Sequence, residues 1–120
     1  MNARTIIQHT QRFGQWLTPR CLKDQNRRFA GTCGVSQANR VGGFVPAFTD
    51  HMTGAVYLSR FADGRQAPVH MLDGLPAELV MSRSRSGRVV AVRETVEAGF
   101  VRDGEFYTRK QAAAAAVTEH

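Results

Sequence analysis

The sequence predicts an α+β fold, in which an antiparallel sheet built from about three hairpins is accompanied by an N-terminal helix and a short C-terminal helix. Three observations support it: apolar residues at helical spacing near the N-terminus, period-two alternation between turn signals in the middle, and an alanine-rich run near the end. The 120 residues suit a single domain. We divide it into a basic helix and loop segment (1–43), an antiparallel β region (44–108) and a C-terminal helix and tail (109–120).

The first predicted element is a helix over about residues 3–17, because its apolar residues lie close to one helical face. These residues are Ile6, Ile7, Phe13, Trp16 and Leu17. Pro19 is expected to end this helix near Leu17 or Thr18. Trp16 is expected to anchor the helix in the core, and base stacking is the alternative role. Residues 23–29 then form either a short helix or a solvated loop.

The β region begins with a hairpin that joins residues 44–48 to residues 55–59 through the loop 50–54. Both arms are rich in β-branched and aromatic residues. Pro46 predicts that its strand lies at an edge of the sheet or pairs on one side only, because proline has no N–H to donate.

The stretch after the first hairpin contains one turn signal, Asp63 followed by Gly64. Residues 66–72 are expected to form a strand that Pro68 interrupts. A further turn then leads into one helical turn at residues 77–79.

The two remaining hairpins are predicted from their turns. Period-two alternation on both sides of the Ser-Gly pair at 86–87 indicates two antiparallel strands. The Asp-Gly pair at 103–104 is a strong signal for a type I′ turn, and it separates strands expected at 99–102 and 105–107.

The C-terminal helix has a start signal in its sequence. Thr108 is expected to cap it, with Gln111 three residues later completing a capping box. Residues 112–116 are all alanine, which has the highest helix propensity. The helix therefore has little apolar bulk, and we expect it to fray or to dock on a partner.

The net charge of +6 is concentrated in the first third of the chain. Residues 1–43 contain seven basic side chains and one acidic side chain, whereas residues 44–120 are balanced. A basic segment favours an anionic partner, although it also serves to keep a soluble protein apart from its neighbours.

Arg83 and Arg85 are expected to share one face of a strand, because residues two apart point the same way. The candidate partner-binding residues are Arg20, Lys23, Arg27, Arg28, Arg40, Arg83 and Arg85.

Motifs for catalysis are missing: the chain has no G-x-S-x-G, no H-E-x-x-H, no Walker loop and no dinucleotide-binding glycine motif. His51 follows Asp50, and His70 lies near Asp73, but either couple would need a nucleophile to form a catalytic set. Glu94 and Glu97 are expected to lie between strands without an obvious partner. We therefore predict a binding protein with no catalytic residues and no cofactor.

The two cysteines, Cys21 and Cys33, do not form a C-x-x-C pair, so the strong zinc signature is missing. We expect both to be small, partly buried thiols and predict no metal. The alternatives are a disulfide between them, or a zinc site completed by His9, His51 or His70.

No apolar run approaches the length of about 20 residues that a membrane span requires. Residues 1–20 also lack the apolar centre of a secretory signal. We therefore expect a cytoplasmic protein that has no membrane partner.

Three stretches carry a resemblance: residues 56–64, residues 70–76 and residues 99–108. Together they resemble short proteobacterial proteins of unassigned function that are common on plasmids, integrated elements and phages. Small non-enzymatic proteins from such elements are often similar in size and character to anti-CRISPR inhibitors. That resemblance implies a protein that blocks a nucleic-acid surveillance complex, for example through a CRISPR effector subunit.

Three functional hypotheses follow. The first is a small non-enzymatic interaction protein that binds a bacterial nucleoprotein complex, or one of its subunits, and inhibits or regulates it. The second is a regulator that binds nucleic acid directly through the basic residues, with an affinity that falls steeply as salt rises. The third is an enzyme that uses Cys21 or Cys33, or a metal, together with His51 or His70.

Overall fold

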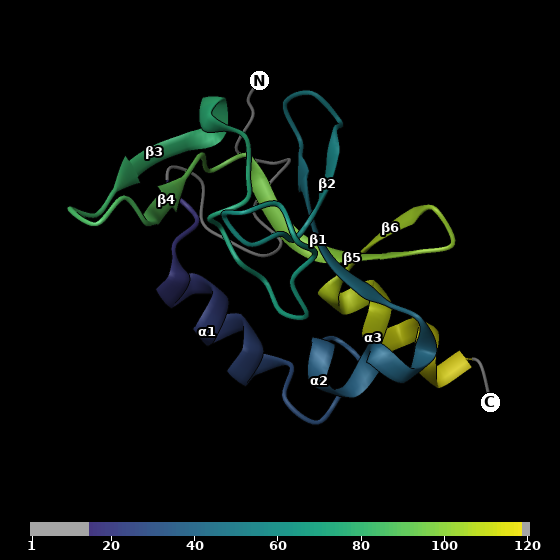
Figure 1. Cartoon of the computed structure of the whole chain (residues 1–120). Helices are drawn as coiled ribbons and strands as arrows, with labels where there is room; N and C mark the ends of the chain where they lie inside the picture. Colours follow the sequence, from purple (N-terminus) through teal and green to yellow (C-terminus); the bar gives the residue numbers. More distant parts are fainter. Residues whose placement is uncertain (1–14, 119–120) are drawn as a thin grey trace, which may run out of the picture.

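The computed structural model describes residues 15–118 and has the predicted α+β class, with its helices below and beside the sheets in the view of Figure 1. The helices are α1 (Pro19–Arg28), α2 (Ser36–Asn39) and α3 (Arg109–Thr118), with 3₁₀ turns η2 (Arg40–Gly42) and η3 (Ala77–Leu79). The strands are β1 (Val45–Asp50), β2 (Val56–Leu58), β3 (Val80–Arg83), β4 (Val89–Val92), β5 (Val96–Arg102) and β6 (Glu105–Thr108).

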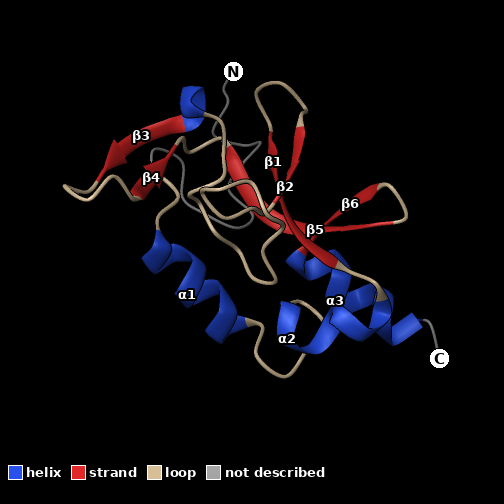
Figure 2. Cartoon of the chain, in the orientation of Figure 1, coloured by secondary structure: helices blue, strands red, loops and turns tan. Residues whose placement is uncertain are grey.

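All three predicted hairpins are confirmed, and they belong to two sheets (Figure 2). One sheet has four antiparallel strands in the order β2-β1-β5-β6, and the other consists of the β3–β4 hairpin alone. The β1–β5 pair joins the first and third hairpins. In the third hairpin, Asp103 (φ 53°) and Gly104 (φ 81°) both have positive φ, as the predicted type I′ turn requires.

The predictions for the strand that contains Pro46 and for the strand around Pro68 were wrong. The strand that contains Pro46 is central, because β1 pairs with β2 on one side and β5 on the other. The Pro46 carbonyl accepts the N–H of Ser59 (2.8 Å). The Pro46 nitrogen, which has no hydrogen to donate, faces the same side of β1 as this carbonyl. At that position β2 has already ended, at Leu58. Residues 66–72 do not form a strand; their only ladder contact is an isolated bridge between Gln66 and Arg60.

The helix predicted over residues 3–17 lies almost entirely outside the described residues. Its last residues are not helical: Leu17 forms an antiparallel bridge with Val92, with N–O distances of 3.0 and 2.9 Å. Trp16 is 44% exposed, so its predicted role as a core anchor was wrong, whereas Leu17 is fully buried. Pro19 begins a helix and does not end one, because its fixed φ and missing N–H suit the first helical turn.

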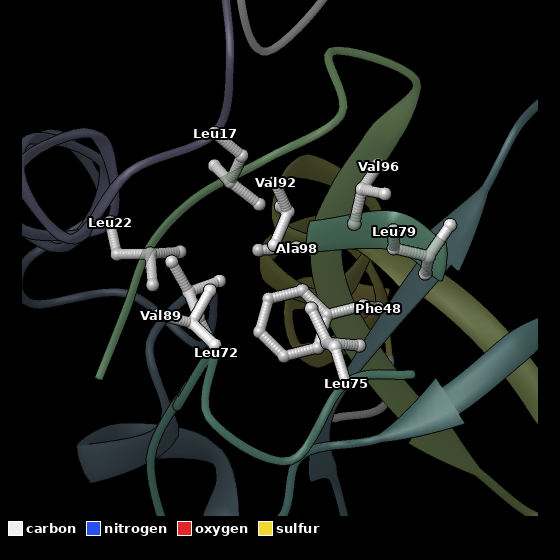
Figure 3. Packing of buried hydrophobic residues seen from close by; sticks show 10 residues of the cluster. All are labelled: Leu17, Leu22, Phe48, Leu72, Leu75, Leu79, Val89, Val92, Val96 and Ala98. Carbon is white, nitrogen blue, oxygen red and sulfur yellow. The ribbon is translucent and has the colours of Figure 1, made fainter. Parts of the chain in front are cut away.

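The main core lies between α1 and the two sheets (Figure 3). It combines residues from α1 and the segment before it, from β1, β4 and β5, and from η3 and the loop before it: Leu17, Leu22, Phe48, Leu72, Leu75, Leu79, Val89, Val92, Val96 and Ala98. A second, smaller cluster of Phe44, Phe100 and Ala112 joins α3 to the four-stranded sheet. Burying an aliphatic or aromatic side chain contributes roughly 1.5–3 kcal/mol, so both clusters hold the helices firmly to the sheets.

The helices are short. α1 and α3 each contain 10 residues, and α3 begins with the predicted capping box. The Thr108 N–H donates to Gln111 Oε1 (2.9 Å), and the Gln111 N–H donates to Thr108 Oγ1 (3.0 Å).

Within residues 15–118, no helix has the length and apolar character needed to cross a membrane.

Candidate binding surface

The segment 23–29, which the sequence left as a helix or a loop, belongs to α1 up to Arg28, and Phe29 is the C-cap of that helix. Thr18 caps this helix by accepting the N–H of Cys21 (3.2 Å), and Pro19 occupies its first position. Leu22 and Gln25 are buried, whereas the opposite side is exposed. The helix therefore has one anchored face and one solvent face.

The solvent face of α1 is basic. At 100° per residue, Arg20, Lys23 and Arg27 point in nearly the same direction, opposite Leu22 and Gln25, and all three are exposed. We call these three residues the basic stripe. Asp24, the only acidic residue of α1, pairs with Arg27 at the surface. Arg20 and Lys23 are therefore left without an ion-pair partner among residues 15–118.

The anchored face of α1 is fixed by a buried arginine of α3. Arg109 is fully buried, and its Nε donates to Gln25 Oε1 (3.1 Å). Its Nη1 donates to the Gly34 carbonyl (3.0 Å), and its Nη2 lies 3.2 Å from His70 Nδ1. No acidic side chain pairs with Arg109 among the described residues. Burial lowers the pKa of Arg109 to about 10, which still leaves it charged at neutral pH.

His70 completes this network as a neutral side chain. Its Nε2 lies 2.7 Å from the Gly99 carbonyl, which can only accept, so Nε2 carries the proton and Nδ1 accepts from Arg109. Its ring also meets Phe48 and Phe100 edge to face, at 5.3 and 5.1 Å. Burial, followed by the charge of Arg109, lowers the pKa of His70 to about 3.

A cleft of about 330 Å³ lies between the C-terminal end of α1 and the start of α3. Arg28 and Lys110 are the exposed basic residues of its lining. Phe29 also lines the cleft and packs against Gly34, where an added Cβ would lie 2.7 Å from Phe29 Cδ1. The remaining lining residues are Gln25, Glu97, Thr108 and Gln111. The exposed surface of the cleft is therefore mostly apolar, with one aromatic ring, two exposed cations and the buried carboxylate of Glu97 in its lining.

The other candidate arginines lie on separate elements. Arg83 ends β3, and its Nη1 donates to the Gly87 carbonyl (3.0 Å). Arg85 lies in the turn beyond the strand, so the prediction that Arg83 and Arg85 share one strand face was wrong. Arg40 lies in η2, with its Nη2 3.4 Å from the Pro68 carbonyl.

The candidate residues are thus divided among three places (Figure 1). Arg28 shares α1 with the basic stripe, and the β3–β4 hairpin that carries Arg83 lies on the same side of the view as α1. The η2 turn with Arg40 lies toward the opposite side. The structure therefore unites four of the seven predicted residues on one helix and leaves Arg40 apart.

The residues considered for catalysis are dispersed. Cys21 and Cys33 are both free, half-buried thiols, as expected from the sequence. No group of three His, Cys, Asp or Glu side chains that could hold a metal ion occurs in residues 15–118, and His9 lies outside them. His70 bonds Gly99 and Arg109, whereas the Asp73 carboxylate accepts the Val89 N–H (2.8 Å) and pairs with an arginine.

Glu97 has a partner that the sequence did not indicate. It lies within β5 and not between strands, and its Oε1 is 2.7 Å from Nε2 of His51. Glu97 is 5% exposed, and its other oxygen, Oε2, has no hydrogen-bond partner among the residues that the structure describes. The expectation that Glu97 lacked an obvious partner was therefore wrong.

Two residues of the site, Lys110 and Arg109, were not predicted. The sequence places both near the start of the last helix, but local patterns do not indicate that this helix starts beside α1. Nothing in the sequence marks Arg109 as buried, because arginine is almost never fully buried unless it is paired. Comparisons of the chain with protein-family models, with curated proteins and with solved structures found no match.

Proposed function

We propose that the chain is a small non-enzymatic interaction protein that binds a bacterial nucleoprotein complex through the basic stripe and thereby inhibits or regulates it. The observation that carries this proposal is the arrangement of Arg20, Lys23 and Arg27 on one exposed face of a helix whose other face is fixed to the core. Positive charge held on a rigid element attracts a polyanionic partner and raises its association rate. The proposal places the protein in the cytoplasm, where such complexes act.

Affinity capture from a bacterial lysate, followed by mass spectrometry, tests this proposal. The wild-type protein is compared with the variant Arg20→Glu/Lys23→Glu. A control variant, Arg65→Glu/Arg93→Glu, makes the same change in net charge at exposed positions outside α1 that are not candidate binding residues. We expect the wild type and the control to retain a nucleoprotein complex, and the α1 variant to lose it. Equal retention by all three proteins would show that the basic stripe is only a solubilising surface.

The resemblance to mobile-element proteins supports one specific form of this function, an anti-CRISPR inhibitor. A plasmid-interference assay in a strain with an active CRISPR system tests that form. Expression of the protein should restore plasmid transformation, and the variant Arg20→Glu/Lys23→Glu should not. Interference that is unchanged by the wild-type protein would remove this form and leave other nucleoprotein complexes as the partner.

A further inference from the structure

The cleft between α1 and α3 adjoins the basic stripe. Arg28 follows Arg27 directly, so it is turned by 100° from the stripe toward the flank of α1 that faces the cleft. Phe29 comes next and lines the cleft, and Lys110 lines it from α3. A chain of phosphates that crosses the stripe can therefore continue between Arg28 and Lys110.

The two exposed cations of the cleft and the Phe29 ring have the composition that proteins use for single-stranded nucleic acid, while Glu97 in the same lining is buried and paired with His51. Such sites combine a basic track for the phosphates with aromatic rings on which bases stack. Here the basic track is the stripe with Arg28 and Lys110, and the ring is Phe29. The packing of Phe29 against Gly34 fixes the ring in place, since an added Cβ at Gly34 would overlap it.

The size of the cleft favours a single strand over a duplex. Its volume of about 330 Å³ lies at the lower end of the range for small-ligand pockets. Bases within a duplex are stacked on their neighbours, and an aromatic ring reaches a base face only where the strand is unpaired.

We infer that the protein binds single-stranded nucleic acid, with phosphates on the basic stripe and one nucleotide in the cleft. The base of that nucleotide stacks on Phe29, and its phosphate lies between Arg28 and Lys110. This inference rests on the proposed function, because the single strand would be the part of the nucleoprotein complex that the protein contacts. It goes further in naming the ligand and the cleft that receives it.

Fluorescence anisotropy with labelled dT12, rU12 and a 12-base-pair DNA duplex tests the inference. We expect both single strands to bind and the duplex to bind at least tenfold more weakly. Up to four phosphate contacts, three on the basic stripe and one between Arg28 and Lys110, predict a log-log salt slope of about −2.8, which corresponds to a loss of about 50-fold between 50 and 200 mM salt. Binding of the duplex as tightly as the single strands would overturn the inference.

Two variants locate the binding site. Phe29→Leu keeps an apolar side chain against Gly34 but removes the ring, and it should weaken single-strand binding about tenfold. Phe61→Leu, at a half-buried aromatic residue on another loop, is the matched control and should bind as the wild type does. Arg28→Gln/Lys110→Gln changes two exposed residues without affecting the core, so it tests the cleft even if Phe29→Leu fails to fold. Wild-type affinity in this double variant would exclude the cleft.

Affinity capture and oligonucleotide binding together distinguish a failure of this inference from a failure of the proposed function. If the lysate yields a complex that stays bound after treatment with a single-strand-specific nuclease, and neither dT12 nor rU12 binds, the proposed function stands and the inference falls. If no complex is retained and neither oligonucleotide binds, both fall. Binding of dT12 or rU12 that depends on the cleft supports the inference whether or not a complex is captured.

Discussion

Nη2 of Arg109 lies 3.2 Å from Nδ1 of His70, so a charged guanidinium donates to a neutral imidazole inside the protein. This contact joins α3 to the loop between β2 and η3, and Arg109 also holds α1 through Gln25. Arg109 therefore helps to fix the position of the basic stripe relative to the sheet, together with Leu22 in the main core. The cleft between α1 and α3 also depends on Arg109.

The first prediction concerns Arg109 itself. Arg109→Ala should lower the free energy of unfolding by about 3 kcal/mol or more, because it leaves buried acceptors on Gln25 and Gly34 without donors and opens a cavity. Urea denaturation monitored by circular dichroism measures this loss. Arg85→Ala, in an exposed turn, is the control and should change stability by less than about 0.5 kcal/mol. Equal stability of the two variants would contradict a structural role for Arg109.

The second prediction is a pH dependence that His70 causes. The unfolded side chain has a pKa near 6.5, whereas the pKa of the folded side chain is lowered to about 3, so between these values the unfolded state binds more protons. The stabilising contribution is complete above pH 6.5 and is lost as pH falls toward 3. At pH 5 the loss is about 2 kcal/mol.

Urea denaturation at pH 7.5 and pH 5 separates this effect from other titrating groups. His70→Gln can still donate to Gly99 and accept from Arg109, but it cannot titrate in this range. We expect the variant to lose less stability than the wild type between the two pH values, by about 2 kcal/mol. Parallel losses in the two proteins would exclude His70 as the cause.

The third prediction concerns the turn of the third hairpin. Gly104 has φ of 81°, a conformation that costs an L-residue roughly 1–2 kcal/mol, so Gly104→Ala should lower the melting temperature by several degrees. Gly42→Ala is a suitable control, because an added Cβ there would meet only the Phe44 ring, at 3.7 Å. Thermal denaturation of both variants checks the prediction, and equal melting temperatures would contradict it.

The hairpins were predictable because their signals are local. A type I′ turn at residues 103–104 needs only two residues that tolerate positive φ, and the capping box of α3 needs only Thr108 and Gln111. The central position of β1 was not predictable, because the long-range pairing with β5 decides it. Pro46 indicated an edge, but its missing N–H lies beyond the end of the short strand β2.

In the candidate site, too, the features with local signals were predictable and those that depend on long-range packing were not. Clustered basic residues in the first third of the chain identified α1, because charge counting needs no tertiary information. The cleft joins α1 to Lys110, a separation along the chain that no local pattern connects. Arg109 looked like any other basic residue, since only packing shows that it is buried.

The last prediction concerns Asp24, whose carboxylate pairs with Arg27 beside the other two residues of the basic stripe. If the stripe binds phosphates, Asp24 opposes binding in two ways, by repelling the ligand and by occupying Arg27. Asp24→Asn should therefore tighten binding of dT12, by about fivefold at 0.1 M salt, which corresponds to one additional phosphate contact. The gain should shrink as salt rises, because the entropy gained by releasing each condensed ion falls as the bulk salt concentration increases. Anisotropy titrations at 0.1 and 0.3 M salt measure both effects.

Glu78→Gln removes one negative charge from an exposed residue of η3 and is the matched control for net charge. If both variants tighten binding equally, overall charge and not the α1 surface attracts the ligand. Unchanged affinity in Asp24→Asn would place the contact away from Arg27.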